Sequence, residues 1–123
     1  MKIRIKDNTI RLRLTKTDVS QLKESGNITC KTIITAEQIF QYALKVDATI
    51  QSISASFESN TMTIRLSASQ AHILTDTDDI TIKGSQKNGE DGDLFILIEK
   101  DLQCLDESDE DQSDMYENKK TVC

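Results

Sequence analysis

The chain contains an internal repeat, in which residues 2–47 align with residues 54–99 at a constant offset of 52 positions. The identical pairs are spread along the whole unit, and they include Asn8-Thr9 with Asn60-Thr61, Arg13-Leu14 with Arg65-Leu66, Ile28-Thr29 with Ile80-Thr81, and Lys31 with Lys83. Two units are too few for a solenoid, in which each repeat stacks on its neighbours. The repeat therefore predicts one domain with pseudo-twofold symmetry.

Each unit has the sequence pattern of a ββαββ motif. Residues 2–6 and 10–14 alternate apolar and charged side chains on either side of Asp7-Asn8, which is typical of a β-hairpin. Thr15 or Thr17 then caps a short helix that ends at Gly26. Strands are predicted after this helix and through the second unit, where Ser67 or Ser69 caps the helix, at 27–34, 38–46, 53–58, 61–66, 79–84 and 93–99. The fold class that follows is a mainly β (α+β) domain, a pseudo-twofold barrel or sandwich.

Residues 1–104 form the predicted domain, and residues 105–123 form a predicted acidic tail. Residues 99–123 hold nine carboxylates against three lysines. Such a segment buries too little apolar surface to offset its ordering entropy, which predicts disorder. A solvating tail is one interpretation, and a tail that folds back on a basic surface or docks on a basic partner is another. The oxygen-bearing residues of 106–117 have the spacing of a calcium loop, but Asp111 stands where that loop needs glycine.

The composition excludes several classes of protein. The net charge of −6 and the pI of about 4.7 argue against tight, non-specific binding to nucleic acid or to an anionic membrane. No run of apolar residues is long enough to span a membrane, and no secretory signal is visible. The three cysteines, Cys30, Cys104 and Cys123, lack a CxxC spacing and favour a reducing compartment. A cytoplasmic protein is therefore predicted.

The order of elements resembles the AbrB-type swapped-hairpin module: strand, tight turn, strand ending in Arg-Leu, hydroxyl-capped helix, strand, loop and strand. The stretch with the closest resemblance is SFESNTMTIRLSASQAHILTDTDDITIKGSQKNGEDGDLFILIEK. In that family two ββαββ units interleave their hairpins in a homodimeric barrel, and many members bind DNA. The resemblance implies two such units fused in one chain. The chain departs from the family in lacking its usual glycine turn and its proline at the strand–helix junction.

A second resemblance covers nearly the whole chain. The opening IRIKDNTIRLRLT, the stretch SASFE and the ending EKDLQCLDESDEDQSD are similar to an uncharacterised family of short bacterial proteins. This resemblance implies no particular activity.

The N-terminal hairpin is the candidate binding site. Its alternation projects five cations to one face, a geometry suited to phosphates along a groove: Lys2, Arg4, Lys6, Arg11 and Arg13. The alternative is that these side chains are only the solvated face of a half-buried sheet. The equivalent face of the second unit retains only Arg65, whereas a symmetric DNA reader needs two basic halves. A structural role is expected for Arg13 and Arg65, and ligand binding is the alternative.

The remaining candidate groups do not predict catalysis. His72 is the only histidine and is expected at a partly exposed helix position, so neither a catalytic set nor a zinc site is predicted. Cys30 aligns with Ile82 and is expected to pack as a small hydrophobe. Phe40, Tyr42, Phe57 and Phe95 stand at apolar strand positions, which predicts no exposed platform for stacking bases. No cofactor or metal is expected.

These observations favour a small, non-catalytic interaction module with a protein partner. The alternative is an AbrB-like nucleic-acid-binding regulator that uses the basic hairpin, and an enzyme is the least supported class. A continuous positive strip on the folded surface would favour DNA, and an interrupted one would favour a protein partner. The sequence leaves a monomer and a homodimer both open.

Overall fold

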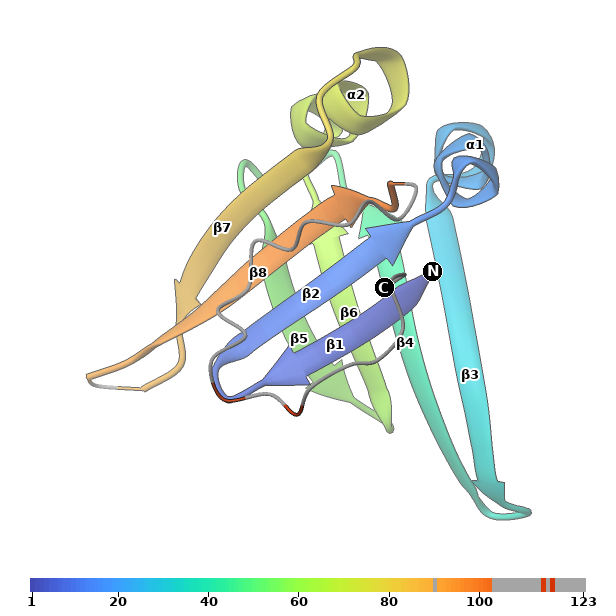
Figure 1. The fold of residues 1–123 in the computed structure, drawn as a ribbon, viewed down its shortest axis with the longest axis vertical. Helices are drawn as coiled ribbons and strands as arrows, with labels where there is room; N and C mark the ends of the chain where they lie inside the picture. The colour runs from blue at the N-terminus through green and yellow to red at the C-terminus, as the bar shows by residue number, and fades with distance from the viewer. Residues whose placement is uncertain (90, 103–113, 115, 117–123) are drawn as a thin grey trace.

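The computed structural model of the protein describes residues 1–89, 91–102, 114 and 116. The chain forms two successive ββαββ units, as the repeat predicts (Figure 1). The first unit comprises β1 (Lys2–Lys6), β2 (Thr9–Leu14), α1 (Lys16–Ser25), β3 (Asn27–Thr35) and β4 (Gln38–Val46). The second unit comprises β5 (Ser54–Glu58), β6 (Thr61–Leu66), α2 (Ala68–Asp76), β7 (Thr81–Lys87) and β8 (Asp93–Lys100).

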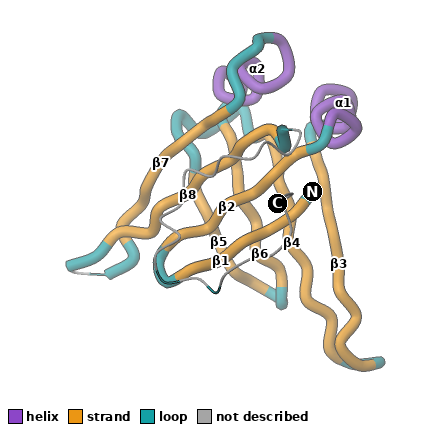
Figure 2. Tube along the Cα trace, in the orientation of Figure 1, coloured by secondary structure: helices purple, strands orange, loops and turns teal. Residues whose placement is uncertain are grey.

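The two units exchange hairpins, so that each four-stranded sheet takes one hairpin from each unit. The first sheet has the order β1-β2-β8-β7, and the second sheet has the order β3-β4-β6-β5. Parallel pairing joins the units, between β2 and β8 in the first sheet and between β4 and β6 in the second. The strands of the two sheets cross, and both helices lie at the same end of the molecule (Figures 1 and 2). The sheets do not close into a barrel, so the sandwich-like form of the predicted fold is the observed one.

The predicted offset of 52 residues holds only for the first half of each unit. Leu12 of β2 pairs with Ile98 of β8, and the equivalent Ile64 of β6 pairs with Leu44 of β4. Leu12 and Ile64 are 52 positions apart, whereas Leu44 and Ile98 are 54 apart. The second half of the repeat is therefore shifted by two residues, and the gapless alignment is wrong there.

The shift arises where the helices end. Helix α1 ends at Gly26, whose left-handed backbone (φ 69°) lets its amide donate to the Leu22 carbonyl over 2.8 Å. Helix α2 lacks such a glycine and ends at Thr77 with extended backbone. It is one residue shorter than α1, but four residues rather than one separate it from the next strand, so β7 starts two residues later than the offset of 52 predicts. Two extra residues keep every side chain on its original face. The expected pairings of Ile28-Thr29 with Ile80-Thr81, of Lys31 with Lys83 and of Cys30 with Ile82 are corrected accordingly: Ile28 corresponds to Ile82, and Cys30 to Gly84.

Local sequence explains the turns and the helix starts. Each N-terminal hairpin turns through two residues, with positive φ at Asp7 in the first unit and at Ser59 and Asn60 in the second. Of the alternative caps, the structure uses Thr15 and Ser67. Both form capping boxes with the side chain three residues later, which satisfy backbone amides of the first helical turn.

The core lies between the sheets and draws on both units. Leu14 and Leu66, at the ends of the N-terminal hairpins, are buried as expected. Ile53 is also buried, but it belongs to the linker, because β5 begins at Ser54. Strand β7 begins at Thr81 and extends to Lys87, later at both ends than predicted. The apolar side chains that complete the buried cluster are Ile10, Leu12, Leu22, Ile28, Leu44, Ile64, Ala71, Leu74, Ile82, Ile96 and Ile98.

Candidate functional site

The outer face of the first sheet gathers cations from both units. On β1 and β2, Lys2 lies opposite Arg13 and Arg4 lies opposite Arg11. Strand β7, at the other edge of this sheet, adds lysines at the same side-chain phase. We call the set the cationic face: Lys2, Arg4, Lys6, Arg11, Arg13, Lys83 and Lys87.

The paired cations of this hairpin are not a requirement of the fold. Like charges directly opposite each other on antiparallel strands destabilise a sheet. In the second unit, the equivalent hairpin places Ser54 opposite Arg65 and Ser56 opposite Thr63. The same backbone therefore forms there without any pair of opposed cations, and the repeat acts as an internal control for the composition of the first hairpin.

Carboxylates offset part of this charge. The Glu99 carboxylate of β8 lies 2.7 Å from Arg13 Nε and 3.8 Å from Arg11 Nε. At the two ends of the face, Lys2 pairs with Asp101 and Lys87 pairs with Asp93. The lysines of the two end pairs are mostly exposed, and such pairs contribute at most about 1 kcal/mol each.

Two other cations of the face have no ion-pair partner within the part of the chain that the structure describes. Among the described residues, no ion pair involves Lys6 or Lys83. The face therefore keeps an excess of positive charge although the chain as a whole is acidic.

An apolar stripe runs through the cationic face along β8. Phe95 lies between Thr9 and Ser85 on the neighbouring strands, and beside these short side chains the residue is 54% exposed. Leu97, two residues further along β8, lies between Arg11 and Lys83. The expectation that no aromatic ring is exposed is therefore wrong for Phe95. It is also wrong for Phe57, which is 56% exposed at the open end of the sheets.

The outer face of the second sheet has a different composition. At the positions equivalent to Phe95 and Leu97, β4 carries Gln41 and Ala43. Ala43 is only 2% exposed. Arg65 belongs to this second face, where its Nη1 donates to Ser56 Oγ over 3.0 Å. The structure thus brings the five hairpin cations together but does not bring Arg65 to them.

The start of β1 is anchored beside α1. The Met1 ammonium lies 2.8 Å from the Asp18 carboxylate, and the Tyr42 hydroxyl donates to the Met1 carbonyl over 2.9 Å. Burial alone would raise the pKa of Asp18, but hydrogen bonds from the Met1 ammonium and from the Thr15 amide and hydroxyl bring that pKa below its ordinary value. These contacts fix the strand that carries Lys2, Arg4 and Lys6.

The other candidate groups do not assemble a second site. His72 is exposed on α2, as expected, and its Nδ1 lies 2.7 Å from Asp76 Oδ2. Cys30 packs against the core, as expected, although its partner in the alignment is Gly84. Within the described part of the chain, no cluster of three or more histidines, cysteines or carboxylates could hold a metal. Cys104, Cys123 and nearly all of the possible calcium loop lie outside the described residues.

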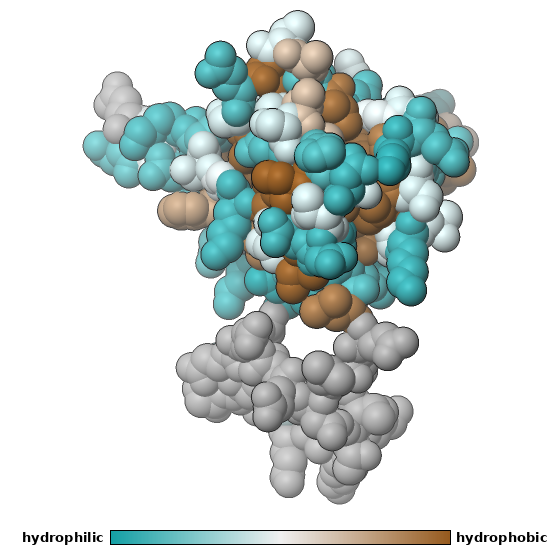
Figure 3. All heavy atoms as spheres, turned by 90° about the horizontal axis from the view of Figure 1, so that it is seen from above, coloured by the Kyte–Doolittle hydropathy of each residue, from teal (hydrophilic) through white to brown (hydrophobic). Residues whose placement is uncertain are grey.

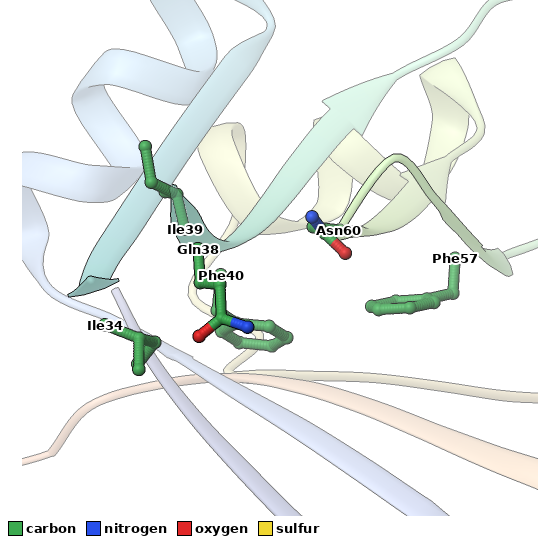
Figure 4. Close-up of a pocket in the computed structure, with 6 residues that line it drawn as sticks. All are labelled: Ile34, Gln38, Ile39, Phe40, Phe57 and Asn60. Atoms are coloured by element: carbon green, nitrogen blue, oxygen red, sulfur yellow. The ribbon is translucent and has the colours of Figure 1, made fainter. Parts of the chain in front are cut away.

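A small cavity of about 290 Å³ lies at the open end of the sheets, beside the turn of the long β3–β4 hairpin (Figure 4). Apolar side chains and two amides line it, without any titratable group: Ile34, Gln38, Ile39, Phe40, Phe57 and Asn60. Such a lining offers no acid, base or nucleophile. At the opposite end, which carries the helices, most of the visible surface is hydrophilic with hydrophobic side chains between (Figure 3).

The family of the chain is shown by a comparison with models of protein families. A family of unknown function (DUF7009) matches residues 1–120. The chain belongs to this family. Membership confirms the expected resemblance to an uncharacterised family, and it does not test the resemblance to AbrB-type modules. No curated protein and no solved structure matches the chain. Neither described helix is long and apolar enough to cross a membrane.

The sequence does not predict four residues of the candidate site, namely Lys83, Lys87, Phe95 and Leu97. They join the hairpin cations only through the parallel pairing of β2 with β8, which links segments more than eighty residues apart. Successive side chains of a strand point to opposite faces, so the register of the β7–β8 hairpin places these four side chains on one face. It does not indicate which other hairpin lies beside it.

Proposed function

We propose that this protein is a small, non-catalytic interaction module that binds an anionic segment of a partner protein on its cationic face. The observation that carries the proposal is the direct opposition of Lys2 to Arg13 and of Arg4 to Arg11. Local rules of sheet stability disfavour these pairs, and the equivalent hairpin of the second unit avoids them. Departures from local rules that the fold does not need are typical of functional surfaces.

The distribution of charge supports a protein partner over a nucleic-acid duplex. The row formed by Phe95, Leu97 and Glu99 on β8 separates the cations of β1 and β2 from those of β7. The positive strip is thus interrupted by apolar side chains and a carboxylate, whereas a duplex backbone is contacted by an array of cations. The acidic net charge of the chain also disfavours binding to nucleic acid at a distance.

A nucleic-acid single strand is the second candidate ligand, and one observation favours it. Phe95 presents an exposed ring among cations, and bases stack on such rings with little sequence preference. The more general alternative is an AbrB-like regulator that binds nucleic acid through the cations of the N-terminal hairpin: Lys2, Arg4, Lys6, Arg11 and Arg13.

Capture experiments with a charge-reversal variant test the proposal. Full-length protein and the variant Arg4→Glu/Lys6→Glu are used to capture partners from native lysate, with and without nuclease. The matched control is Lys31→Glu/Lys45→Glu, which changes the net charge equally on the outer face of the second sheet. We expect protein partners that survive nuclease and are lost only with the first variant. Loss of all partners on nuclease treatment would contradict the proposal and favour the nucleic-acid candidate.

The same proposal places the protein in the cytoplasm as a monomer or a homodimer. The free thiol of Cys30 is compatible with a reducing compartment. Fractionation of the native cell and sedimentation of the purified chain test these two points.

A further inference from the structure

The apolar stripe within the cationic face indicates what kind of anionic segment the site accepts. Resting on the proposed function, we infer that the ligand is an extended acidic segment with an apolar side chain at its centre, which packs on Phe95 and Leu97 between the cations of β2 and β7. The inference adds Lys83 and Lys87 to the binding surface and assigns a role to the exposed ring of Phe95.

The geometry of the sheet sets the dimensions of this site. Phe95 and Leu97 are two residues apart on one strand, so their side chains project from the same face about 7 Å apart. Neighbouring strands are separated by about 4.8 Å, which places Arg11 and Lys83 directly on either side of Leu97. An extended segment along β8 would therefore meet apolar surface beneath it and, at Leu97, a cation on each side.

The ion pairs of the face concentrate its remaining charge beside the stripe. Asp93 and Glu99 stand at the two ends of the β8 row, where they pair with Lys87 and Arg13. Lys83, in the middle of the adjacent strand β7, has no ion pair among the described residues. Lys83 thus offers its charge to an acidic ligand on the β7 side of Leu97, and Arg11, whose Nε also lies 3.8 Å from Glu99 Oε1, adds charge on the β2 side.

The second sheet provides the internal control. Its equivalent row reads Gln41, Ala43 and Lys45, without an exposed apolar side chain. The two rows have equivalent neighbours in the fold, so sheet formation does not demand Phe95 at this position. Phe95 and Leu97 together form a continuous apolar patch that is rimmed by polar and charged side chains, an arrangement typical of a contact surface.

Two fluorescent probes separate the contributions of the stripe and of the charge. One probe is a glutamate-rich dodecapeptide with Leu-Phe at its centre, and the other has Ser-Ser there. Binding of both to the full chain is followed by fluorescence anisotropy at low and at physiological salt. We expect the Leu-Phe peptide to bind about tenfold more tightly, because burial of one apolar side chain contributes about that factor.

The variant Phe95→Ser should remove this difference between the peptides and leave binding of the Ser-Ser peptide unchanged. Lys83→Glu should weaken both peptides. The controls at matched positions of the second sheet, Gln41→Ser and Thr29→Glu, should change neither affinity. Circular dichroism of every variant verifies that the fold is retained.

The outcomes separate this inference from the proposed function. If Phe95→Ser binds both peptides as the parent protein does, the apolar anchor is wrong and the acidic-segment function stands. If the parent protein binds neither peptide at low salt, the proposed function fails, and the inference fails with it. If a single-stranded oligothymidylate binds more tightly than either peptide and loses affinity in Phe95→Ser, the site is one for nucleic acid and the inference is overturned.

Discussion

Arg13 and Glu99 face each other across the parallel pair β2 and β8, with 2.7 Å between Nε and Oε1. One residue comes from each unit, so the contact joins the repeats at the centre of the first sheet. It also places one of the few carboxylates of this face among its cations. Glu99 therefore moderates the positive potential that an anionic ligand meets.

Replacing Glu99 with glutamine should tighten binding of an acidic peptide by several-fold, because the substitution removes a negative charge from among the cations. The gain should shrink as salt rises, since exposed charges are screened. Anisotropy titrations at two salt concentrations measure the effect. Glu58→Gln, on the outer face of the second sheet, is the matched control. Equal gains for both variants would show that only net charge matters.

Truncation of the buried leucine side chains at the ends of the N-terminal hairpins should destabilise the whole domain. Leu14 and Leu66 are almost fully buried at equivalent positions of the two units. Leu14→Ala and Leu66→Ala should each lower the free energy of unfolding by about 2–5 kcal/mol, through lost burial and the cavity left behind. Urea unfolding measures both losses. Values below about 1 kcal/mol for both would contradict the described core.

A methyl group added at Gly84 should disrupt the packing of the linker residue Ile53 against β7. The Cβ of an alanine there would overlap Ile53 Cγ2, and Ile53 is buried. Gly84→Ala should therefore cost about 1–3 kcal/mol of unfolding free energy. Gly89→Ala, where an added Cβ meets nothing within 4 Å, is the control.

The cost of Gly84→Ala should shrink in an Ile53→Ala background, where the linker side chain no longer occupies that space. A double-mutant cycle by urea unfolding measures this coupling. An undiminished cost in the double variant would place the strain elsewhere.

Acidification should remove the stabilisation that Asp18 provides. Because the pKa of Asp18 is lower in the folded state than its ordinary value, this stabilisation is present above about pH 4 and is lost as pH falls through the folded value. The loss of unfolding free energy between pH 7 and pH 3 should thus be smaller in Asp18→Asn than in the parent protein. The exposed Asp79 provides the control Asp79→Asn. An Asp18→Asn variant with the same pH dependence as the parent would refute the assignment.

Neutralising the acidic C-terminal sequence should strengthen ligand binding. Residues 106–117 carry seven carboxylates and no lysine or arginine, and nearly all of them lie outside the described residues. Asp101, five positions before the run, has its carboxylate 3.4 Å from Lys2 Nζ, so only a short stretch of sequence separates the run from the cationic face. A tether this short gives a millimolar effective concentration. Competition with an acidic ligand is the expected consequence.

The variant that tests this competition replaces four carboxylates of the run with amides: Asp109, Glu110, Asp111 and Asp114. Its control makes the same kind of replacement at four carboxylates outside the first sheet: Glu24, Glu37, Asp47 and Glu58. Peptide affinity should rise several-fold in the first variant and much less in the second. The same rise in both would show an effect of net charge alone.

Local patterns in the sequence account for most of the fold. Strict alternation around Asp7-Asn8 predicts the first hairpin, and the hydroxyls of Thr15 and Ser67 predict the helix starts. The gapless register fails after the second helix, where chance identities such as Ile28 with Ile80 mask a two-residue insertion. The missing C-terminal glycine of α2 is the physical signal that marks it.

The sequence predicts only part of the candidate site. The hairpin cations follow from alternation within one hairpin, which is a local property. Phe95 and Lys83 join them through pairing between distant segments, which alternation does not specify. The exposure of Phe95 depends further on the short side chains of Thr9 and Ser85 beside it, and this is known only once the strand register is known.

The exchange of hairpins between the sheets determines the molecularity of folding. Neither unit contains both hairpins of one sheet, so a chain ending before the linker would need a second chain to complete either sheet. That reaction would be second order, with stability that depends on concentration. The linker around Ile53 converts it into a first-order reaction, in which one molecule supplies both halves at any dilution.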